Sequence, residues 1–232
     1  MIYLLFGLSG ISGLIFEIIW VRQFGNLFGN PIHSAALVTA IFMLGLGLGA
    51  YLAGIYADRK GESHPAIFIR YHAYLEIAIG AAGFLYAVLM PHLEVLSPAI
   101  SAYVVVENGW RELSLSSHLS RYLIATVFLL PVTLLMGGTL TLLIRFLVAD
   151  DLRKAGWRTG LLYAANTAGA ALGCFLVDYS LIPNIGLFGS QAMATVRHRR
   201  RGNLVRRLFS GRKTPPAGGP SRCLPVDVER LV

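Results

Sequence analysis

Five stretches of this chain are apolar over about twenty residues each, and this length restricts what the chain can fold into. A helix needs roughly 20 apolar residues to cross the hydrocarbon core of a bilayer, which is about 30 Å thick. The stretches are residues 2–21, 35–57, 71–90, 122–144 and 160–182. Only 14% of all residues are charged, against about a quarter in soluble domains. The sequence therefore predicts an all-α fold, a polytopic transmembrane helix bundle.

A sixth apolar stretch begins after Pro183 and is short. It covers residues 185–196, before Arg197, and about a dozen residues cannot cross a bilayer. The prediction is five full spans plus an incomplete sixth, which together form a transmembrane domain over residues 1–195. No Lys or Arg precedes the first stretch and four more follow it, so we expect a permanent helix there rather than a cleaved signal peptide.

Charge divides the chain into two parts. Residues 1–195 contain ten Lys/Arg and ten Asp/Glu, whereas residues 196–232 contain ten Lys/Arg and two Asp/Glu, so the net charge of +8 lies in the second part. That part is rich in Pro and Gly, and we expect a basic, disordered tail. Because the basic residues are confined to it, we expect the lipid bilayer as a partner and no nucleic acid.

The basic residues of the connections predict the topology in the membrane. From the N-terminus onward, the connections after the five spans contain one, three, two, four and no Lys/Arg. Since basic residues are retained on the cytoplasmic side, this alternation predicts a multi-pass protein of the inner membrane with a cytoplasmic N-terminus. The basic tail lies on the same side only if a sixth helix crosses back.

Small residues recur at helical spacing within the spans. Gly45, Gly47 and Gly49 lie in an uncharged run of 23 residues, so we interpret them as packing positions rather than as a nucleotide-binding loop, which needs a preceding strand. Small residues three or four apart lie on one face of a helix, and small residues on that face let helices approach closely in lipid. The positions concerned are Gly45 with Gly49, Ala50 with Gly54, Gly7 with Gly10 and Gly13, and Ala165 with Gly169 and Gly173.

Three carboxylates and one carboxamide lie inside the predicted spans, namely Glu17, Glu76, Asp178 and Asn166. A charged side chain at the centre of a bilayer costs about 2.5–3.5 kcal/mol on insertion scales, so each carboxylate needs a partner. The carboxylates either form a cation or proton site, or each is hydrogen-bonded to another helix and kept neutral. We favour the second interpretation, because nothing in the sequence brings the three together. Asn166 is expected to hydrogen-bond across helices.

The connection after the second span has a distinct pattern of glycine and charge. Gly54, Asp58, Arg59 and Gly61 resemble the signature loop of the major facilitator superfamily, whereas Glu62 stands where that family prefers a positive charge. The resemblance implies that Asp58 and Arg59 clamp helix ends and gate a conformational change. The alternative is a tight, charged turn that anchors two helices at the headgroups.

Cysteines and histidines indicate no further site. Cys174 and Cys223 are far apart, and the six histidines lack ligand spacing. The sequence predicts no metal site, no cofactor and no catalytic constellation.

Several segments, in order, resemble the membrane part of bacterial membrane-bound spermidine synthase-like proteins. They are residues 6–22, 28–30, 42–54, 135–139 and 163–173, and the resemblance covers about residues 4–188. In that family, major-facilitator-like helices are fused to an aminopropyltransferase domain. The resemblance implies a major-facilitator-like half-bundle that serves as the membrane module of such a fusion. Its implied partners are a polyamine and either a second half or another copy of the chain.

The catalytic half of that family is not visible in this sequence. An aminopropyltransferase needs a Rossmann-like domain with a Gly-rich turn and acidic residues, and the segment after Gly160 offers no such pattern. We therefore expect that the chain does not catalyse aminopropyl transfer by itself. The alternative function is a major-facilitator-type half-transporter for a small, cationic solute.

The abrupt change near residue 195 leads to a hypothesis about the gene. A half-finished helix followed by Arg, Pro and Gly is expected when GC-rich DNA is translated out of frame, so we expect residues 196–232 to be a frameshift or truncation product. The alternative is a real cytoplasmic tail, attracted to anionic lipid by about 1 kcal/mol per basic residue.

Overall fold

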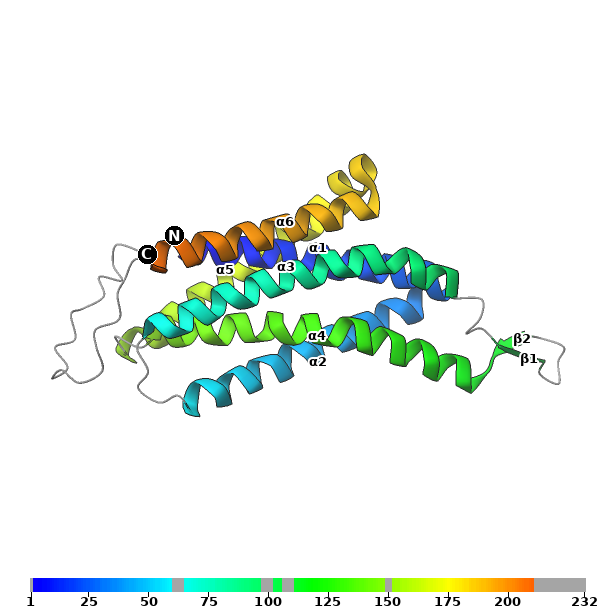
Figure 1. The fold of residues 1–232 in the computed structure, drawn as a ribbon, viewed down its shortest axis with the longest axis horizontal. Helices are drawn as coiled ribbons and strands as arrows, with labels where there is room; N and C mark the ends of the chain where they lie inside the picture. Colours follow the sequence, from blue (N-terminus) through cyan, green and yellow to red (C-terminus); the bar gives the residue numbers. More distant parts are fainter. Residues whose placement is uncertain (1, 60–64, 97–101, 106–110, 149–151, 211–232) are drawn as a thin grey trace.

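The computed structural model describes residues 2–59, 65–96, 102–105, 111–148 and 152–210 (Figure 1). Within these ranges the long helices are α1 (Ile2–Phe28), α2 (Pro31–Arg59), α3 (Pro65–Leu96), α4 (Leu115–Val148), α5 (Ala155–Leu176) and α6 (Ile182–Ser210). Between α3 and α4, strands β1 (Tyr103–Val105) and β2 (Arg111–Leu113) pair antiparallel. A 3-10 turn, η2 (Leu152–Lys154), precedes α5, and a π-helical turn, η3 (Val177–Leu181), joins α5 to α6.

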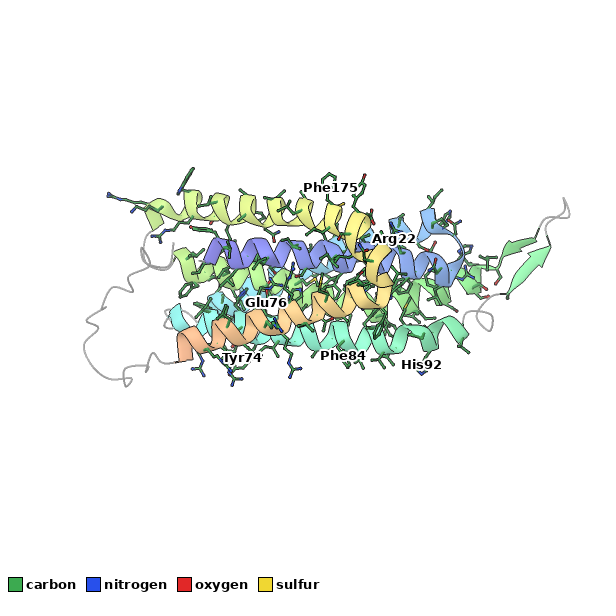
Figure 2. The ribbon with its side chains drawn as sticks, turned by 90° about the horizontal axis from the view of Figure 1, so that it is seen from above. Arg22, Tyr74, Glu76, Phe84, His92 and Phe175 are labelled. Carbon is green, nitrogen blue, oxygen red and sulfur yellow. The ribbon has the colours of Figure 1, made fainter. Side chains whose placement is uncertain are left out.

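Among the described residues, five helical segments are long and apolar enough to cross a membrane. Four of them belong to α1, α2, α3 and α4, and the fifth runs Ala155–Arg207 because α5, η3 and α6 follow one another without a loop. Large apolar side chains remain on the outer faces: Phe84 and Phe175 are 58% and 66% exposed and lie outside the bundle, whereas Glu76 lies inside it (Figure 2). The predicted all-α fold with helices of membrane-spanning length is confirmed.

The helices lie side by side along the long axis of the molecule, as Figure 1 shows. The start of α1 and the ends of α2, α4 and α6 lie at one end of the bundle. The α1–α2 turn and the β1–β2 hairpin lie at the other. Arg59 ends α2 and Arg207 lies near the end of α6. Basic residues from distant parts of the sequence therefore gather at the same end.

The sixth helix is longer than predicted. α6 continues past Val196, where we expected the helix to stop, so residues 196–210 are helical and the prediction of a disordered tail is wrong for them. Residues 211–232 lie outside the described residues, and the predicted domain boundary at 195 falls within α6. The buried positions of α6 recur every three or four residues and are mostly small or polar; they are Ser190, Gln191, Ala194, Thr195, His198, Arg201, Gly202 and Val205. A search for apolar runs misses this helix because its buried face is not apolar.

Gly186 allows α6 to run back along the bundle. Its φ is 69° and its ψ is −178°, a backbone conformation that is essentially restricted to glycine. The chain reverses its direction in this region (Figure 1), after which α6 packs mainly against α3 and also contacts α1. The last helix therefore joins the bundle instead of leaving it.

Glycines bring the main helix pairs into close contact, as predicted for most of them. A Cβ added at Gly45 or Gly49 of α2 would collide with Thr133 or Leu134 of α4. In the α1–α5 pair, a Cβ at Gly169 would collide with the carbonyl of Gly7, and a Cβ at Gly173 would lie 2.5 Å from the carbonyl oxygen of Ile11. The packing interpretation is confirmed at these positions. It is wrong for Gly13 and Gly54, where a Cβ would meet no atom within 4 Å among the neighbours described.

We expect Gly49→Ala to destabilise the bundle and Gly47→Ala, its matched control in the same helix, to leave it unchanged or more stable. A Cβ at Gly49 meets the backbone of α4, whereas a Cβ at Gly47 meets nothing within 4 Å. Overpacking costs about 1–3 kcal/mol, while Ala is favoured over Gly in a helix by about 1 kcal/mol. Thermal unfolding of the purified chain in detergent measures both changes. Equal effects at the two positions would contradict the close α2–α4 contact.

Candidate functional site

The carboxylate of Glu76, in α3, is buried inside the bundle, with the residue 1% exposed. Its Oε1 accepts a hydrogen bond of 3.1 Å from the hydroxyl of Ser9 in α1. Its Oε2 lies 2.7 Å from Nδ1 of His198 and 3.6 Å from Nη2 of Arg201, both in α6. One carboxylate therefore connects three helices.

Arg201 of α6 contacts Glu76 of α3 and also donates hydrogen bonds to α1. Its Nη2 donates to the hydroxyl of Ser12 at 3.1 Å, and its Nη1 donates to the carbonyl of Leu5 at 3.4 Å. His198 precedes it by three residues, so both side chains lie on the same face of α6. The Glu76–His198–Arg201 cluster is thus held by Ser9 and Ser12, two hydroxyls of α1.

His72 adds the fourth helix to this cluster. It precedes Glu76 by four residues on α3, with its Nε2 4.0 Å from Oε1 of Glu76. Its Nδ1 lies 3.1 Å from the carbonyl oxygen of Thr139 in α4. Both His72 and Glu76 are buried, and together they connect α3 to α1, α4 and α6.

The charges of the cluster compensate one another, which indicates that the cluster holds helices together rather than forming an open binding site. A carboxylate removed from water is costly unless an opposite charge and hydrogen bonds compensate it. Arg201 supplies the positive charge, while Ser9 and His198 occupy the two carboxylate oxygens. Glu76 contacts other helices, as one interpretation of the sequence expects, but through an ion pair instead of as a neutral acid.

The other polar residues predicted within the spans lie elsewhere and have separate partners. Glu17 accepts a hydrogen bond of 3.3 Å from the hydroxyl of Thr39 in α2. Asp178, in η3, forms a partly exposed ion pair of 2.7 Å with Arg22 of α1. Asn166 lies against Gly10, whose added Cβ would collide with the Asn166 backbone. Because their partners differ, the structure does not bring Glu17, Glu76 and Asp178 into one cation site.

The predicted gating residues lie at the end of α2. Asp58 forms an ion pair with Arg145 of α4, which connects the ends of these two helices. Arg59 is exposed, and the surroundings of Gly54 would accommodate a Cβ. Gly61 lies outside the described residues. The contact of Asp58 is thus with a neighbouring helix end, which fits both the gating and the anchoring interpretation.

A second buried polar contact, which the sequence analysis does not predict, joins α1, α3 and α6. The side-chain amide of Gln23 donates to Oε1 of Gln191 at 3.1 Å, and Gln191 donates to the carbonyl of Gly83 at 3.2 Å. His198 and Arg201 were also missed. The sequence signal that could identify them is their spacing: Gln191, His198 and Arg201 are seven and three residues apart, which places them on one face of a helix.

The cluster holds no evident metal site. Among the residues that the structure describes, no group of three or more His, Cys, Asp or Glu side chains is arranged to hold a metal ion. The arrangement connects helices to one another through charge and hydrogen bonds.

We expect Arg201→Gln to destabilise the chain strongly, because it leaves the Glu76 charge buried without compensation. Removing one partner of a buried ion pair costs about 3–5 kcal/mol. The double variant Glu76→Gln/Arg201→Gln should recover part of this loss, and Arg199→Gln, an exposed arginine on the same helix, should change stability by no more than about 0.5 kcal/mol. Unfolding in detergent measures all three. Additive effects of the two single substitutions would contradict the ion pair.

A curated protein with distant similarity to the chain is the polyamine aminopropyltransferase of Corynebacterium efficiens, which is 26% identical over 200 residues. The similarity covers 86% of this chain and 33% of that protein, so the chain spans about a third of the length of its relative. No protein-family model and no solved structure matches the chain. The chain thus combines helices of membrane-spanning length with a distant similarity to a polyamine aminopropyltransferase.

Proposed function

We propose that the chain is the integral membrane module of a spermidine synthase-like protein. The observation that carries the proposal is the extent of the similarity to a polyamine aminopropyltransferase. It covers 200 of 232 residues, and the described chain is almost entirely helical. The matched region must therefore include most of the membrane-type helices, which supports a fusion of such helices to an aminopropyltransferase.

The module is proposed to anchor or serve a catalytic domain rather than to transfer the aminopropyl group itself. The glycine-rich segment Gly45–Gly49 lies within α2, and its buried glycines pack against α4. They are thus used for helix contact, whereas a nucleotide-type cofactor needs an exposed glycine-rich loop between a strand and a helix. The buried acid Glu76 is compensated by Arg201, which leaves it unsuited to holding a polyamine cation.

A half-transporter for a small cationic solute, with a major-facilitator-like arrangement, is the alternative. It requires a carboxylate that a cation can reach from the solute pathway. Both oxygens of Glu76 have protein partners and the residue is 1% exposed, so the geometry favours the membrane module. A second copy of the chain or a second half-bundle remains a proposed partner, and a polyamine is proposed as a substrate of the full fusion alone.

We propose an inner-membrane location with the N-terminus in the cytoplasm. The proposal is supported by the alternation of basic residues between connections and by the common end at which α1 begins and α6 ends (Figure 1). Basic residues favour the cytoplasmic side, and α6 brings its arginines back to that end. With only five spans, the basic residues after residue 195 would lie on the side opposite the cytoplasm, against the tendency of basic residues. The return of α6 places them on the cytoplasmic side.

Transport and transfer assays separate the proposed functions. We expect the purified chain in liposomes to take up no radiolabelled putrescine or spermidine, and to form no spermidine from putrescine and decarboxylated S-adenosylmethionine. Glu76→Gln serves as the matched variant in both assays, and a soluble aminopropyltransferase as the positive control. Uptake by the unaltered chain that Glu76→Gln abolishes would support the half-transporter instead. Spermidine formation would contradict a non-catalytic module.

Single-cysteine labelling tests the orientation. With Cys174 and Cys223 replaced by serine, Ile32→Cys should react in intact cells with a membrane-impermeant maleimide, while Arg207→Cys should react only after permeabilisation. Both positions are exposed, Ile32 at the α1–α2 turn and Arg207 near the end of α6. The reverse pattern would place the N-terminus outside, and labelling of both in intact cells would contradict a bundle that spans the membrane.

A further inference from the structure

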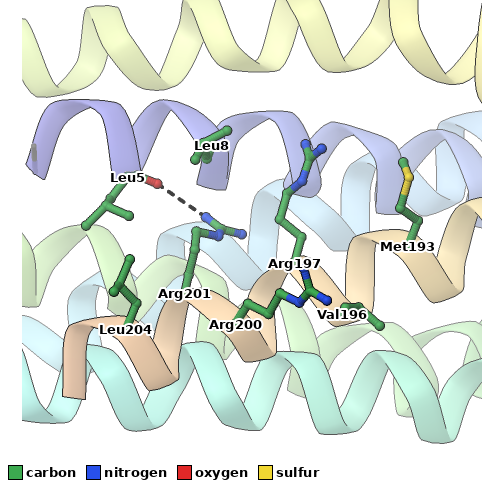
Figure 3. A pocket seen from close by; sticks show the side chains of 8 residues that line it. All are labelled: Leu5, Leu8, Met193, Val196, Arg197, Arg200, Arg201 and Leu204. Atoms are coloured by element: carbon green, nitrogen blue, oxygen red, sulfur yellow. Dashed lines mark hydrogen bonds between the residues drawn. The ribbon is translucent and has the colours of Figure 1, made fainter. Parts of the chain in front are cut away.

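A groove of about 360 Å³ lies between the start of α1 and the second half of α6 (Figure 3). Leu5 and Leu8 of α1 line one wall, and Met193, Val196 and Leu204 of α6 contribute further apolar surface. The remaining lining residues are Arg197, Arg200 and Arg201. The groove therefore combines apolar walls with three guanidinium groups.

Two of these arginines carry charge that the described part of the chain does not balance. Arg201 is compensated by Glu76, which lies 3.6 Å away. Arg197 and Arg200 form no ion pair with any described acidic side chain, because all four of these side chains have other partners; they are Glu17, Asp58, Glu76 and Asp178. Arg197 is half-buried and Arg200 exposed. The groove thus presents two uncompensated cations beside apolar surface, which is complementary to an anion that carries an apolar group.

The position of the groove along the bundle narrows the choice of ligand. Leu5 and Leu8 lie three and six residues after Ile2, where α1 begins. At 1.5 Å per residue they are about 5 and 9 Å from the end of the helix. In a spanning bundle this is the boundary between headgroups and acyl chains, on the side where the basic connections gather. Anionic lipids are attracted to basic residues at such a boundary.

We propose that this groove binds one anionic phospholipid, with its phosphate on Arg197 and Arg200 and an acyl chain along Leu5, Leu8 and Val196. A free phosphate compound would use the arginines but leave the apolar walls uncovered. A zwitterionic lipid would cover the walls, but its own cation would oppose the two arginines. An anionic lipid satisfies both surfaces, and the bound lipid would fasten α6 to α1 beside the Glu76–His198–Arg201 cluster.

Native mass spectrometry of the full chain in detergent tests this site. The probes are dioleoyl phosphatidylglycerol, dioleoyl phosphatidylcholine and the soluble headgroup compound glycerol 1-phosphate. The variants are Arg197→Gln/Arg200→Gln and the matched control Arg199→Gln/Arg206→Gln, which removes the same charge from exposed positions of α6 outside the groove. We expect phosphatidylglycerol to bind at least about tenfold more tightly than phosphatidylcholine. Its affinity should fall roughly 30-fold in the groove variant, about fivefold per arginine, and by less than about threefold in the control.

Three results would overturn the proposal. Equal affinity for the two lipids would show that the arginines select no charge, and equal losses in both double variants would show diffuse attraction to the whole basic helix. Displacement of phosphatidylglycerol by an equal concentration of glycerol 1-phosphate would show that the groove binds a soluble phosphate compound. The first and third measurements use the unaltered chain, so they decide the proposal even if a variant does not fold.

Discussion

A carboxylate inside a bundle of membrane-type helices must be compensated by other parts of the same chain, and Glu76 imposes this requirement on the whole fold. Neither water nor lipid can supply the positive charge at a residue that is 1% exposed. The charge comes from Arg201 in the last helix, so α6 has to turn back and pack against α3. Arg201 is in turn positioned by Ser12 and by the carbonyl of Leu5 in α1. One buried charge thus links the first, third and sixth helices.

Close backbone contact is what allows the charges to meet. Gly80 and Gly202 lie at the α3–α6 contact, where a Cβ at Gly80 would be 3.1 Å from the backbone nitrogen of Arg199 and a Cβ at Gly202 would be 2.8 Å from the carbonyl of Ala73. Without side chains at these positions, α6 approaches α3 closely enough for His198 to reach Glu76. The same device recurs in the α2–α4 and α1–α5 pairs. The bundle therefore depends on small residues for distance and on a few polar side chains for register.

The spans could be predicted from the sequence because their apolar length is a direct requirement of the bilayer. Glu76 was also identified, since a lone acid in an apolar run is conspicuous. Its partners His198 and Arg201 could not be predicted. An arginine normally marks the end of a membrane segment, so the sequence analysis ends the sixth apolar stretch before Arg197. Arg201 is tolerated within the helix because Glu76 neutralises it, a fact that depends on tertiary contact. A break between the fifth and sixth stretches was expected after Pro183, and the chain does turn at Gly186, where the backbone is not helical.

The distance in sequence between the two halves of the charge cluster has a consequence for biosynthesis. Glu76 and His198 are 122 residues apart, and a ribosome adds about 5–20 residues per second. Glu76 is therefore added to the chain roughly 6–24 seconds before His198. During that interval Glu76 has to be protonated, or sheltered by the insertion machinery or by Ser9 and His72. The contact between α3 and α6 that compensates Glu76 can form only after Arg201 has been synthesised.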